Sequence, residues 1–284
     1  MKTETITAIR NDFLSYQKLI NLYTANKDLF FDELHLNLAG WFSANTCSIL
    51  GAILTKIQNG INSVTINSGS ATDILERNGF LSHFGNERKI DTIGTTIQYQ
   101  VLSPSDDRYF NNYVSKGFLS KPDMPKISTG LKKKLTESIY EIFVNATMHS
   151  ETDKIFVCGQ FFPAKQKIEF MISDIGIGIK KAINNRFNSN LSGVQAISWA
   201  IKEGNTTKKG ITGGIGLSLL YKFIKLNHGK VQIVSNDGFW QLDNGVVNKE
   251  SFSEEFPGTM VNISVLTNDT ASYRLKSEVP DNPF

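Results

Sequence analysis

A carboxylate and a carboxamide stand one helical turn apart near the middle of the chain. Glu141 and Asn145 lie in a segment with helical periodicity that begins near Ser128. A spacing of four places both side chains on one face of the helix. An amide oxygen can ligate Mg²⁺, and a carboxylate can polarise an attacking water or hydroxyl. The pair suits phosphoryl chemistry, and the alternative is an exposed polar face. The predicted apolar stripe is Leu131, Leu135, Ile139, Phe143 and Ala146.

An aspartate and two glycines at alternate positions end a predicted strand. Residues Ile168 to Ile172 alternate as a strand does, and Asp174, Gly176 and Gly178 follow. An aspartate at a strand end can accept the exocyclic amine of a purine, and the glycines let the backbone pass close to a ligand. A tight turn is the alternative. The third glycine of the dinucleotide fingerprint is missing, which argues against that fold.

A glycine cluster precedes a predicted helix that runs from Leu217 to Asn227. The cluster consists of Gly210, Gly213, Gly214 and Gly216. Phosphate oxygens bind well to free backbone N–H groups at a helix start, where the helix dipole also favours an anion. Close packing is the alternative, and the pattern is not that of a P-loop. The pairs Lys180-Lys181 and Lys208-Lys209 flank the glycines and either serve a ligand or form solvated faces.

These three blocks together resemble a known superfamily of ATPases. Glu141 with Asn145, the D-I-G-I-G run from Asp174 and the G-G-I-G-L run from Gly213 look, in this order, like the N, G1 and G2 boxes of the gyrase, histidine-kinase and MutL (GHKL) ATPases. Gly258-Thr259, before a predicted strand that ends at Val265, is similar to the Gly-Thr that closes the family's pocket. The resemblance covers close to half of the chain, from about residue 128.

The resemblance implies an α/β sandwich, with a mixed sheet and helices on one face, that binds ATP and Mg²⁺. It implies that Glu141 is the general base, that Asn145 is the Mg²⁺ ligand and that Asp174 anchors the adenine. Lys208, or its neighbour Lys209, is the candidate for the γ-phosphate. A lid would span residues 180 to 212 and include a helix over 192–202. The residues that would line the nucleotide are Gly176, Gly178, Gly213, Gly214, Gly216, Leu217 and Thr259.

The resemblance also separates branches of the superfamily. Histidine kinases usually carry Asn where this chain has Glu141, whereas the hydrolysing branches and the anti-sigma-factor serine kinases carry Glu. The chain shows no long two-helix segment that presents a phosphoacceptor histidine. Gyrase-type and mismatch-repair ATPases have a following transducer domain, and only about nineteen residues follow Val265 here. We therefore expect hydrolysis, or transfer to a hydroxyl.

The amino-terminal half shows alternating strand and helix patterns. A helix is predicted over about 5–25, strands at Glu33–Leu38 and Val64–Asn67, and helices over 43–59 and 71–84. Further along, a strand is predicted over 95–102 and a helix over 106–118. The order of these elements and the segment around Ser68 and Ser70 resemble STAS domains, in which a GHKL kinase phosphorylates such a serine. A helix N-cap is the alternative for either serine.

The length of the chain and the position of two prolines predict two domains. A chain of 284 residues exceeds the usual size of one domain. Two prolines between residues 120 and 125 mark the predicted boundary. We expect a STAS-like α/β domain over 1–120, a GHKL domain over 126–268 and a tail over 269–284.

Composition gives no support to several classes of protein, and nucleic-acid binding is unsupported without being excluded. A net charge of +3 is too small to support nucleic-acid binding. The 2 cysteines lack the spacing of a disulfide framework or a zinc site. We find neither a signal peptide nor a membrane span, so a cytoplasmic location is expected.

Three functions fit this sequence. The leading hypothesis is an ATPase whose lid and partner binding are switched by hydrolysis, with a protein partner or second protomer bound through the lid or the amino-terminal domain. The rival is a serine/threonine kinase of the anti-sigma type that acts on a STAS-like partner or on its own amino-terminal domain. In the third, ATP is a structural ligand that is never turned over.

Overall fold

The computed structural model describes residues 1–149, 153–202, 205 and 215–278, with the backbone alone at 147–149 and 215–217. At its centre is a five-stranded sheet in the order β4-β6-β7-β9-β8, and every pairing in it is antiparallel. The strands are β4 (Thr96–Leu102), β6 (Ile155–Phe162), β7 (Lys167–Asp174), β8 (Lys230–Asp243) and β9 (Val246–Leu266). The α/β class is confirmed.

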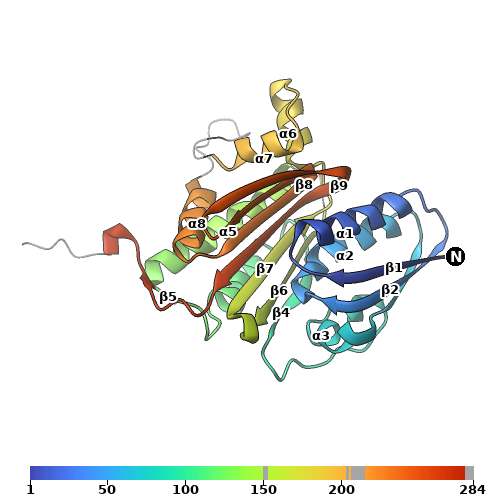
Figure 1. Ribbon diagram of the computed structural model, residues 1–284, viewed down its shortest axis with the longest axis horizontal. Coiled ribbons are helices and arrows are strands. Elements are labelled where there is room, and N and C mark those ends of the chain that lie inside the picture. The colour runs from blue at the N-terminus through green and yellow to red at the C-terminus, as the bar shows by residue number, and fades with distance from the viewer. Residues whose placement is uncertain (150–152, 203–204, 206–214, 279–284) are drawn as a thin grey trace, which may run out of the picture.

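The expected mixed sheet is wrong, because every pairing in the central sheet is antiparallel. Two hairpins, β6–β7 and β8–β9, supply four of the five strands, which makes their pairing antiparallel. Helices also cover both faces of the sheet (Figure 1). On one face lie α5 (Thr129–His149) and α8 (Ile215–Leu226), and on the other lie α1 (Phe13–Asn26) and α2 (Cys47–Gln58).

Alternation along the strands divides the apolar residues between two cores. Val157 of β6, Ile172 of β7 and Val261 of β9 point into the core under α5 and α8. Cys158 and Met171, their neighbours in sequence, point into the other core, with α1 and α2. Both faces of the central strands are thus dry, as the burial of all of β7 except Lys167 shows.

The amino-terminal unit is a second, parallel sheet. β1 (Lys2–Ile9), β2 (Glu33–Phe42) and β3 (Ser63–Asn67) lie in the order β1-β2-β3 and pack on α1 and α2. The molecule therefore has four layers, two sheets and two helical layers in alternation (Figure 1). The predicted strands at Glu33–Leu38 and Val64–Asn67 are confirmed. The predicted opening helix is wrong over its first residues, because alternating threonines and isoleucines favour the strand β1.

The residues before the expected domain boundary belong to the central sheet. β4 pairs with β6, and α4 (Asp107–Asn112) and the π-helix η4 (Tyr113–Phe118) pack into the core beneath α5. Residues 1–120 are therefore not one separate unit, because β4 completes the central sheet. The helix expected over 71–84 is interrupted: α3 (Thr72–Arg77) is flanked by the 3₁₀ helices η2 (Gly69–Ala71) and η3 (Leu81–Phe84), with a positive φ of 82° at Gly79 between α3 and η3.

The remaining short elements close the ends of the fold. Before α5, β5 (Lys126–Ile127) pairs in parallel with β10 (Ser272–Tyr273), so part of the expected tail is tied to the start of α5. The others are α6 (Gly178–Phe187), α7 (Gly193–Ala200) and the 3₁₀ turns η1 (Ala44–Thr46), η5 (Pro163–Lys165) and η6 (Lys276–Glu278). In the described part of the chain, no helix combines the length and apolar character needed to cross a membrane.

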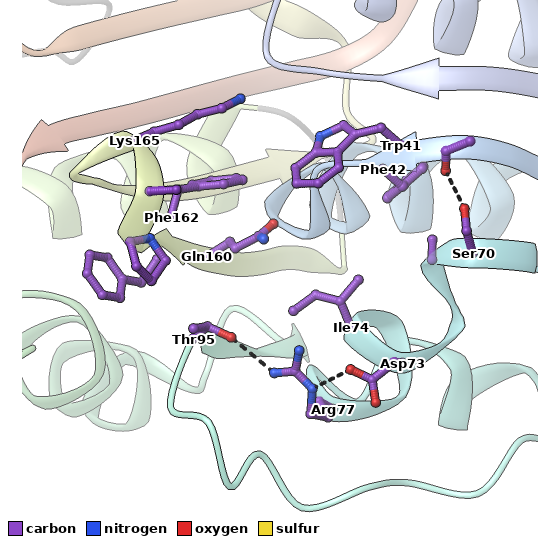
Figure 2. Close-up of a pocket in the computed structure, with 15 residues that line it drawn as sticks. Trp41, Phe42, Ser70, Asp73, Ile74, Arg77, Thr95, Gln160, Phe162 and Lys165 are labelled. Atoms are coloured by element: carbon purple, nitrogen blue, oxygen red, sulfur yellow. Dashed lines mark hydrogen bonds and ion pairs between the residues drawn. The ribbon is translucent and has the colours of Figure 1, made fainter.

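A pocket opens where the amino-terminal unit meets the β6–β7 hairpin. Its walls come from the end of β2, from η2 and α3, and from residues 160–165 (Figure 2). Its volume is about 520 Å³.

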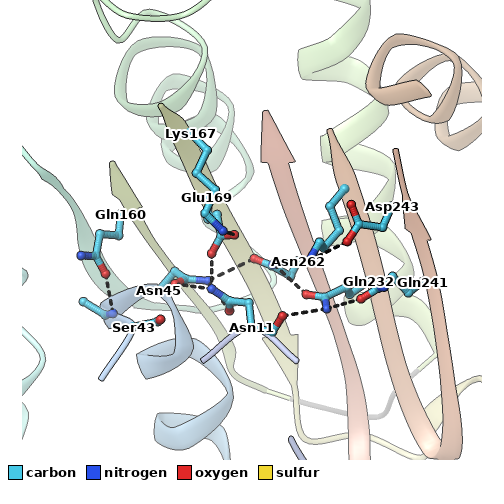
Figure 3. Close-up of polar contacts among 12 residues, drawn as sticks. Asn11, Ser43, Asn45, Gln160, Lys167, Glu169, Gln232, Gln241, Asp243 and Asn262 are labelled. Atoms are coloured by element: carbon cyan, nitrogen blue, oxygen red, sulfur yellow. Dashed lines mark hydrogen bonds and ion pairs between the residues drawn. The ribbon is translucent and has the colours of Figure 1, made fainter. Parts of the chain in front are cut away.

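A buried polar network joins the amino-terminal unit to the central sheet (Figure 3). The Asn45 amide, which is fully buried, donates to Asn11 Oδ1 at 2.9 Å and to Asn262 Oδ1 at 3.1 Å. Asn11 also donates to the carboxylate of Glu169, which is fully buried and paired with Lys167 at 2.5 Å. Buried polar groups are costly unless they are hydrogen-bonded, so this network fixes the way α1 and α2 sit on the sheet.

We predict that Asn45→Leu lowers the free energy of unfolding by about 3 kcal/mol, because it leaves Asn262 Oδ1 buried without a donor and removes the shorter of two hydrogen bonds to Asn11 Oδ1. Urea unfolding measures the change. Asn21→Leu on the exposed face of α1 is the control and should shift stability by less than about 0.5 kcal/mol. Equal stability of the two variants would contradict the assigned role of the network.

Candidate functional site

Asp174 is the most unusual side chain among the predicted site residues. It ends β7, as predicted, and only 4% of its surface is exposed. Its Oδ1 accepts hydrogen bonds from the backbone N–H of Gly176 at 2.8 Å and of Thr259 at 3.3 Å. Its Oδ2 accepts no hydrogen bond from any residue that the structure describes. The structure thus brings three predicted residues together around one buried carboxylate with a spare acceptor.

Burial raises the pKa of Asp174 from 3.8 to about 7. The two backbone N–H groups act in the opposite direction but do not offset the loss of water. A donor that reached Oδ2 would stabilise the ionised form and lower this pKa. Asp174 Oδ2 therefore remains able to accept one further hydrogen bond.

Two glycines permit the close backbone approach on which this arrangement depends. Gly258 has φ of 153°, and a Cβ at this position would lie 2.1 Å from the carbonyl oxygen of Asp174. Gly178 has φ of 78°, and a Cβ there would lie 2.3 Å from Asn236 Oδ1. Both positions require glycine, because a side chain would separate the loop after β7 from β8 and β9.

Two side chains of β8 that the sequence did not single out hold the start of α6. Ser235 Oγ accepts from the N–H of Ile179 at 2.8 Å and lies 3.0 Å from Thr259 Oγ1. Asn236 Oδ1 accepts from the N–H of Lys180 at 3.1 Å. A register shift in the β8–β9 ladder at these residues turns them toward the loop. No local motif marks Ser235 or Asn236, because their roles depend on pairing with distant segments.

Glu141 and Asn145 lie on α5 as predicted. Ser128 Oγ accepts from the N–H of Leu131 at 3.2 Å and so caps the helix start. All five residues of the predicted apolar stripe are buried. Glu141 is half-buried and Asn145 is exposed one turn later, so the carboxylate and the amide are both off the apolar stripe. The predicted helix that carries both residues is confirmed.

The connections at the far end of the helical layer show how α5 and α8 run. Asn227, directly after α8, donates to the carbonyl of Leu266 at 3.0 Å and accepts from its N–H at 2.7 Å. Leu266 is paired with Lys167, at the end of β7 away from Asp174. The carboxyl end of α8 is thus at the Lys167 end of the sheet, and Gly216, in its first turn, points toward the Asp174 end.

The start of α5 lies beside the same carboxyl end of α8. Tyr273, which pairs with Ile127 just before α5, donates through its hydroxyl to the carbonyl of Leu226 at 3.3 Å. Since α5 and α8 pack against each other, they run antiparallel. The end of α5 with Asn145, the first turn of α8 and the end of β7 with Asp174 therefore gather at one end of the molecule.

Some predicted residues fall outside this description. Lys208, Gly213 and Gly214 lie outside the described residues, as does most of the later part of the expected lid. Gly216 and Leu217 are described only as backbone of α8.

The lysines at the start of α6 are engaged by acidic residues. Lys180 pairs with Asp237 at 3.0 Å and with Glu255 at 2.9 Å, and Lys181 pairs with Glu255 at 3.0 Å. Glu255, with Asp237, raises the pKa of Lys180. These contacts hold α6 to β8 and β9. The structure therefore favours a structural role for this lysine pair over a role in ligand binding.

The two serines considered as acceptors lie in the amino-terminal unit. Ser68 is buried, with its hydroxyl 2.7 Å from Thr72 Oγ1, and it makes no side-chain cap to η2. Ser70 is exposed and donates to the carbonyl of Gly40 at 3.1 Å.

Comparison with known proteins assigns no family or function to this chain. A scan against protein-family models finds no family that matches this chain, and a search of curated proteins finds no match.

We predict that the stability advantage of Asp174→Asn over the wild type grows by roughly 2–3 kcal/mol between pH 5 and pH 8. The folded pKa of about 7 lies above the unfolded value of 3.8, so the unfolded chain releases its proton first. The wild type thus loses stability as pH rises toward 7, whereas the asparagine variant does not. Urea unfolding at several pH values measures the difference. Asp123→Asn, at an exposed position, should give a pH-independent offset. A flat difference for Asp174→Asn would show that its pKa is ordinary.

Proposed function

We propose that this chain binds Mg·ATP at the Asp174 end of the central sheet and hydrolyses it. The observation that carries the proposal is the buried Asp174 carboxylate, with Oδ1 held by Gly176 and Thr259 and with no described partner on Oδ2. The exocyclic amine of adenine is a planar N–H donor that matches this acceptor. The resemblance to the GHKL ATPases assigns the same residue the same role.

The helical layer supplies the groups for phosphoryl chemistry. In the proposal, the amide oxygen of Asn145 ligates Mg²⁺, which when bound neutralises charge on the phosphate oxygens. Glu141, one turn earlier on α5, takes a proton from the attacking water. The half-buried position of Glu141 keeps its carboxylate beside the apolar stripe, while the exposed Asn145 remains accessible to a phosphate-bound ion.

The phosphates are assigned to the first turn of α8. The start of a helix offers free N–H groups and a positive dipole, and Gly216 in this turn has no side chain to obstruct an anion. The antiparallel packing of α5 and α8 supports this assignment, because it directs that turn toward the end of α5 with Asn145. Gly213, Gly214 and Lys208, which precede the helix, remain part of the proposal.

Hydrolysis is proposed to act as a switch for a protein partner or a second protomer. ATP would hold the segment between α6 and α8 in one state, and release of phosphate would let it change. A serine/threonine kinase would use the same Glu141 to activate a hydroxyl. Mass spectrometry of the chain after incubation with ATP distinguishes these reactions, because a kinase leaves phosphate on serine or threonine, whereas an ATPase releases it.

We predict that Glu141→Ala lowers the rate of phosphate release about 100-fold or more while ATP affinity changes less than about threefold, because the general base acts in the chemical step. Asn145→Ala is expected to lose the Mg²⁺-dependent part of ATP binding.

Asp174→Asn should weaken ATP binding about tenfold or more, through loss of a charged acceptor. Phosphate release and calorimetric titration with Mg·ATP measure these effects.

The matched control is Glu137→Ala, one turn before Glu141 on the same helix. Glu137 is half-exposed and pairs with Lys134 at 2.7 Å, so its loss should leave turnover unchanged. If purified chain fails to bind ATP, the proposed function is wrong. If Glu141→Ala hydrolyses as fast as the wild type, the assigned base is wrong.

A further inference from the structure

The pocket between the amino-terminal unit and the β6–β7 hairpin lies away from the proposed ATP site. In the hairpin, Ile155 is paired with Asp174 and Phe162 with Lys167. The pocket is built around the Phe162 end, so about seven strand residues, roughly 23 Å, separate it from Asp174. A ligand here would contact both the amino-terminal unit and the central sheet.

Aromatic rings form the apolar part of the pocket. Trp41 and Phe162 line it with Ile74 from α3 (Figure 2). Trp41 is 50% exposed, and its Nε1 donates to Ser43 Oγ at 3.3 Å, which fixes the edge of the ring. An exposed indole face beside a pocket of about 520 Å³ offers a flat apolar surface for another ring.

A buried amide in the pocket has a free donor. Gln160 is only 8% exposed, and its Oε1 accepts from the N–H of Ala44 at 2.6 Å. This bond orients the amide, and its Nε2 has no hydrogen-bond partner among the described residues. Because the amide is oriented by its bond to Ala44, Nε2 is available to donate to an acceptor on a ligand in the pocket.

A lysine at the rim adds uncompensated positive charge. Lys165 Nζ lies 5.5 Å from the ring centre of Trp41 and 5.8 Å from that of Phe162. No carboxylate in the described part of the chain lies within ion-pairing distance of Lys165. The other cation of the lining, Arg77, is already paired with Asp73 and Asp91. Gln160 Nε2 and Lys165 Nζ are therefore both hydrogen-bond donors available to a ligand, and the second carries a positive charge.

We infer that this pocket binds a small planar aromatic carboxylate. Its ring lies on the exposed face of Trp41 and against Phe162, beside the Lys165 ammonium that contacts both rings. Its carboxylate accepts from Lys165 and Gln160, which supply the charge and the donor that the pocket leaves unused. Since the walls come from both units, such a ligand stabilises the junction between them.

Calorimetric titration of the full chain with naphthalene-2-carboxylate tests this inference. We expect one molecule to bind per chain. The neutral carboxamide of the same ring and the saturated decalin carboxylate should each bind about tenfold or more weakly, because one lacks the charge and the other the aromatic face. Absence of saturable binding, or equal binding of all three compounds, overturns the inference.

Variants locate the binding site. Lys165→Met keeps the aliphatic stem and should weaken naphthalene-2-carboxylate binding about tenfold while leaving the carboxamide unchanged. Trp41→Leu, at a half-exposed position, should weaken the binding of both compounds. It should keep the wild-type circular dichroism spectrum and urea midpoint. Lys133→Met, at an exposed position of α5, is the control and should change the affinity for neither compound.

Asp174→Asn separates this inference from the proposed function. It should leave naphthalene-2-carboxylate binding unchanged even if it abolishes ATP binding. Loss of naphthalene-2-carboxylate binding in Asp174→Asn, with normal affinity in Lys165→Met, would place the compound at the other site and overturn the inference.

Discussion

The central strands are buried on both faces, and the rest of the fold follows from this constraint. All of β7 except Lys167 is buried, so a helical layer is needed on each side of the sheet. The chain takes one layer, α5 and α8, from its second half and the other, α1 and α2, from its beginning. A sheet buried on both faces tolerates polar side chains only where hydrogen-bonding groups on neighbouring elements contact them. The contacts of Glu169 with Asn11 and of Asn262 with Asn45, both on facing elements, satisfy that condition.

Local periodicity predicted the elements well, and their partners poorly. The alternation from Ile168 to Ile172 and the apolar stripe of α5 reflect which side of each element is buried, and the structure has both. The strand around residues 96–102 was also found, but nothing in its own sequence says that it pairs with β6 rather than with the amino-terminal strands. The antiparallel pairing of the central sheet was likewise missed, since the resemblance implied a mixed sheet and pairing depends on segments far apart.

In the candidate site, too, the residues in local motifs were predicted, whereas those that depend on contacts with distant segments were missed. Asp174, Gly176 and Thr259 were predicted from short motifs, and their backbone contacts bring them together. Ser235 and Asn236 were missed because their environment is created by a register shift between two strands. The pocket at Trp41 and Gln160 was missed for a related reason. Each residue alone fits an ordinary strand, and only the junction of two units gives them a common cavity.

The contacts of α1 determine when the protein can finish folding. Phe13 stacks on Phe252 with ring centres 4.6 Å apart, and the Tyr16 hydroxyl donates to Gln232 across 216 positions of sequence. During synthesis α1 can therefore complete its packing only after β8 and β9, more than 200 positions further along the chain, have been made. Such non-local contacts slow folding, and until they form the apolar sides of α1 and α2 face solvent. During synthesis this segment is therefore exposed to aggregation, although in the finished protein its apolar side chains are buried.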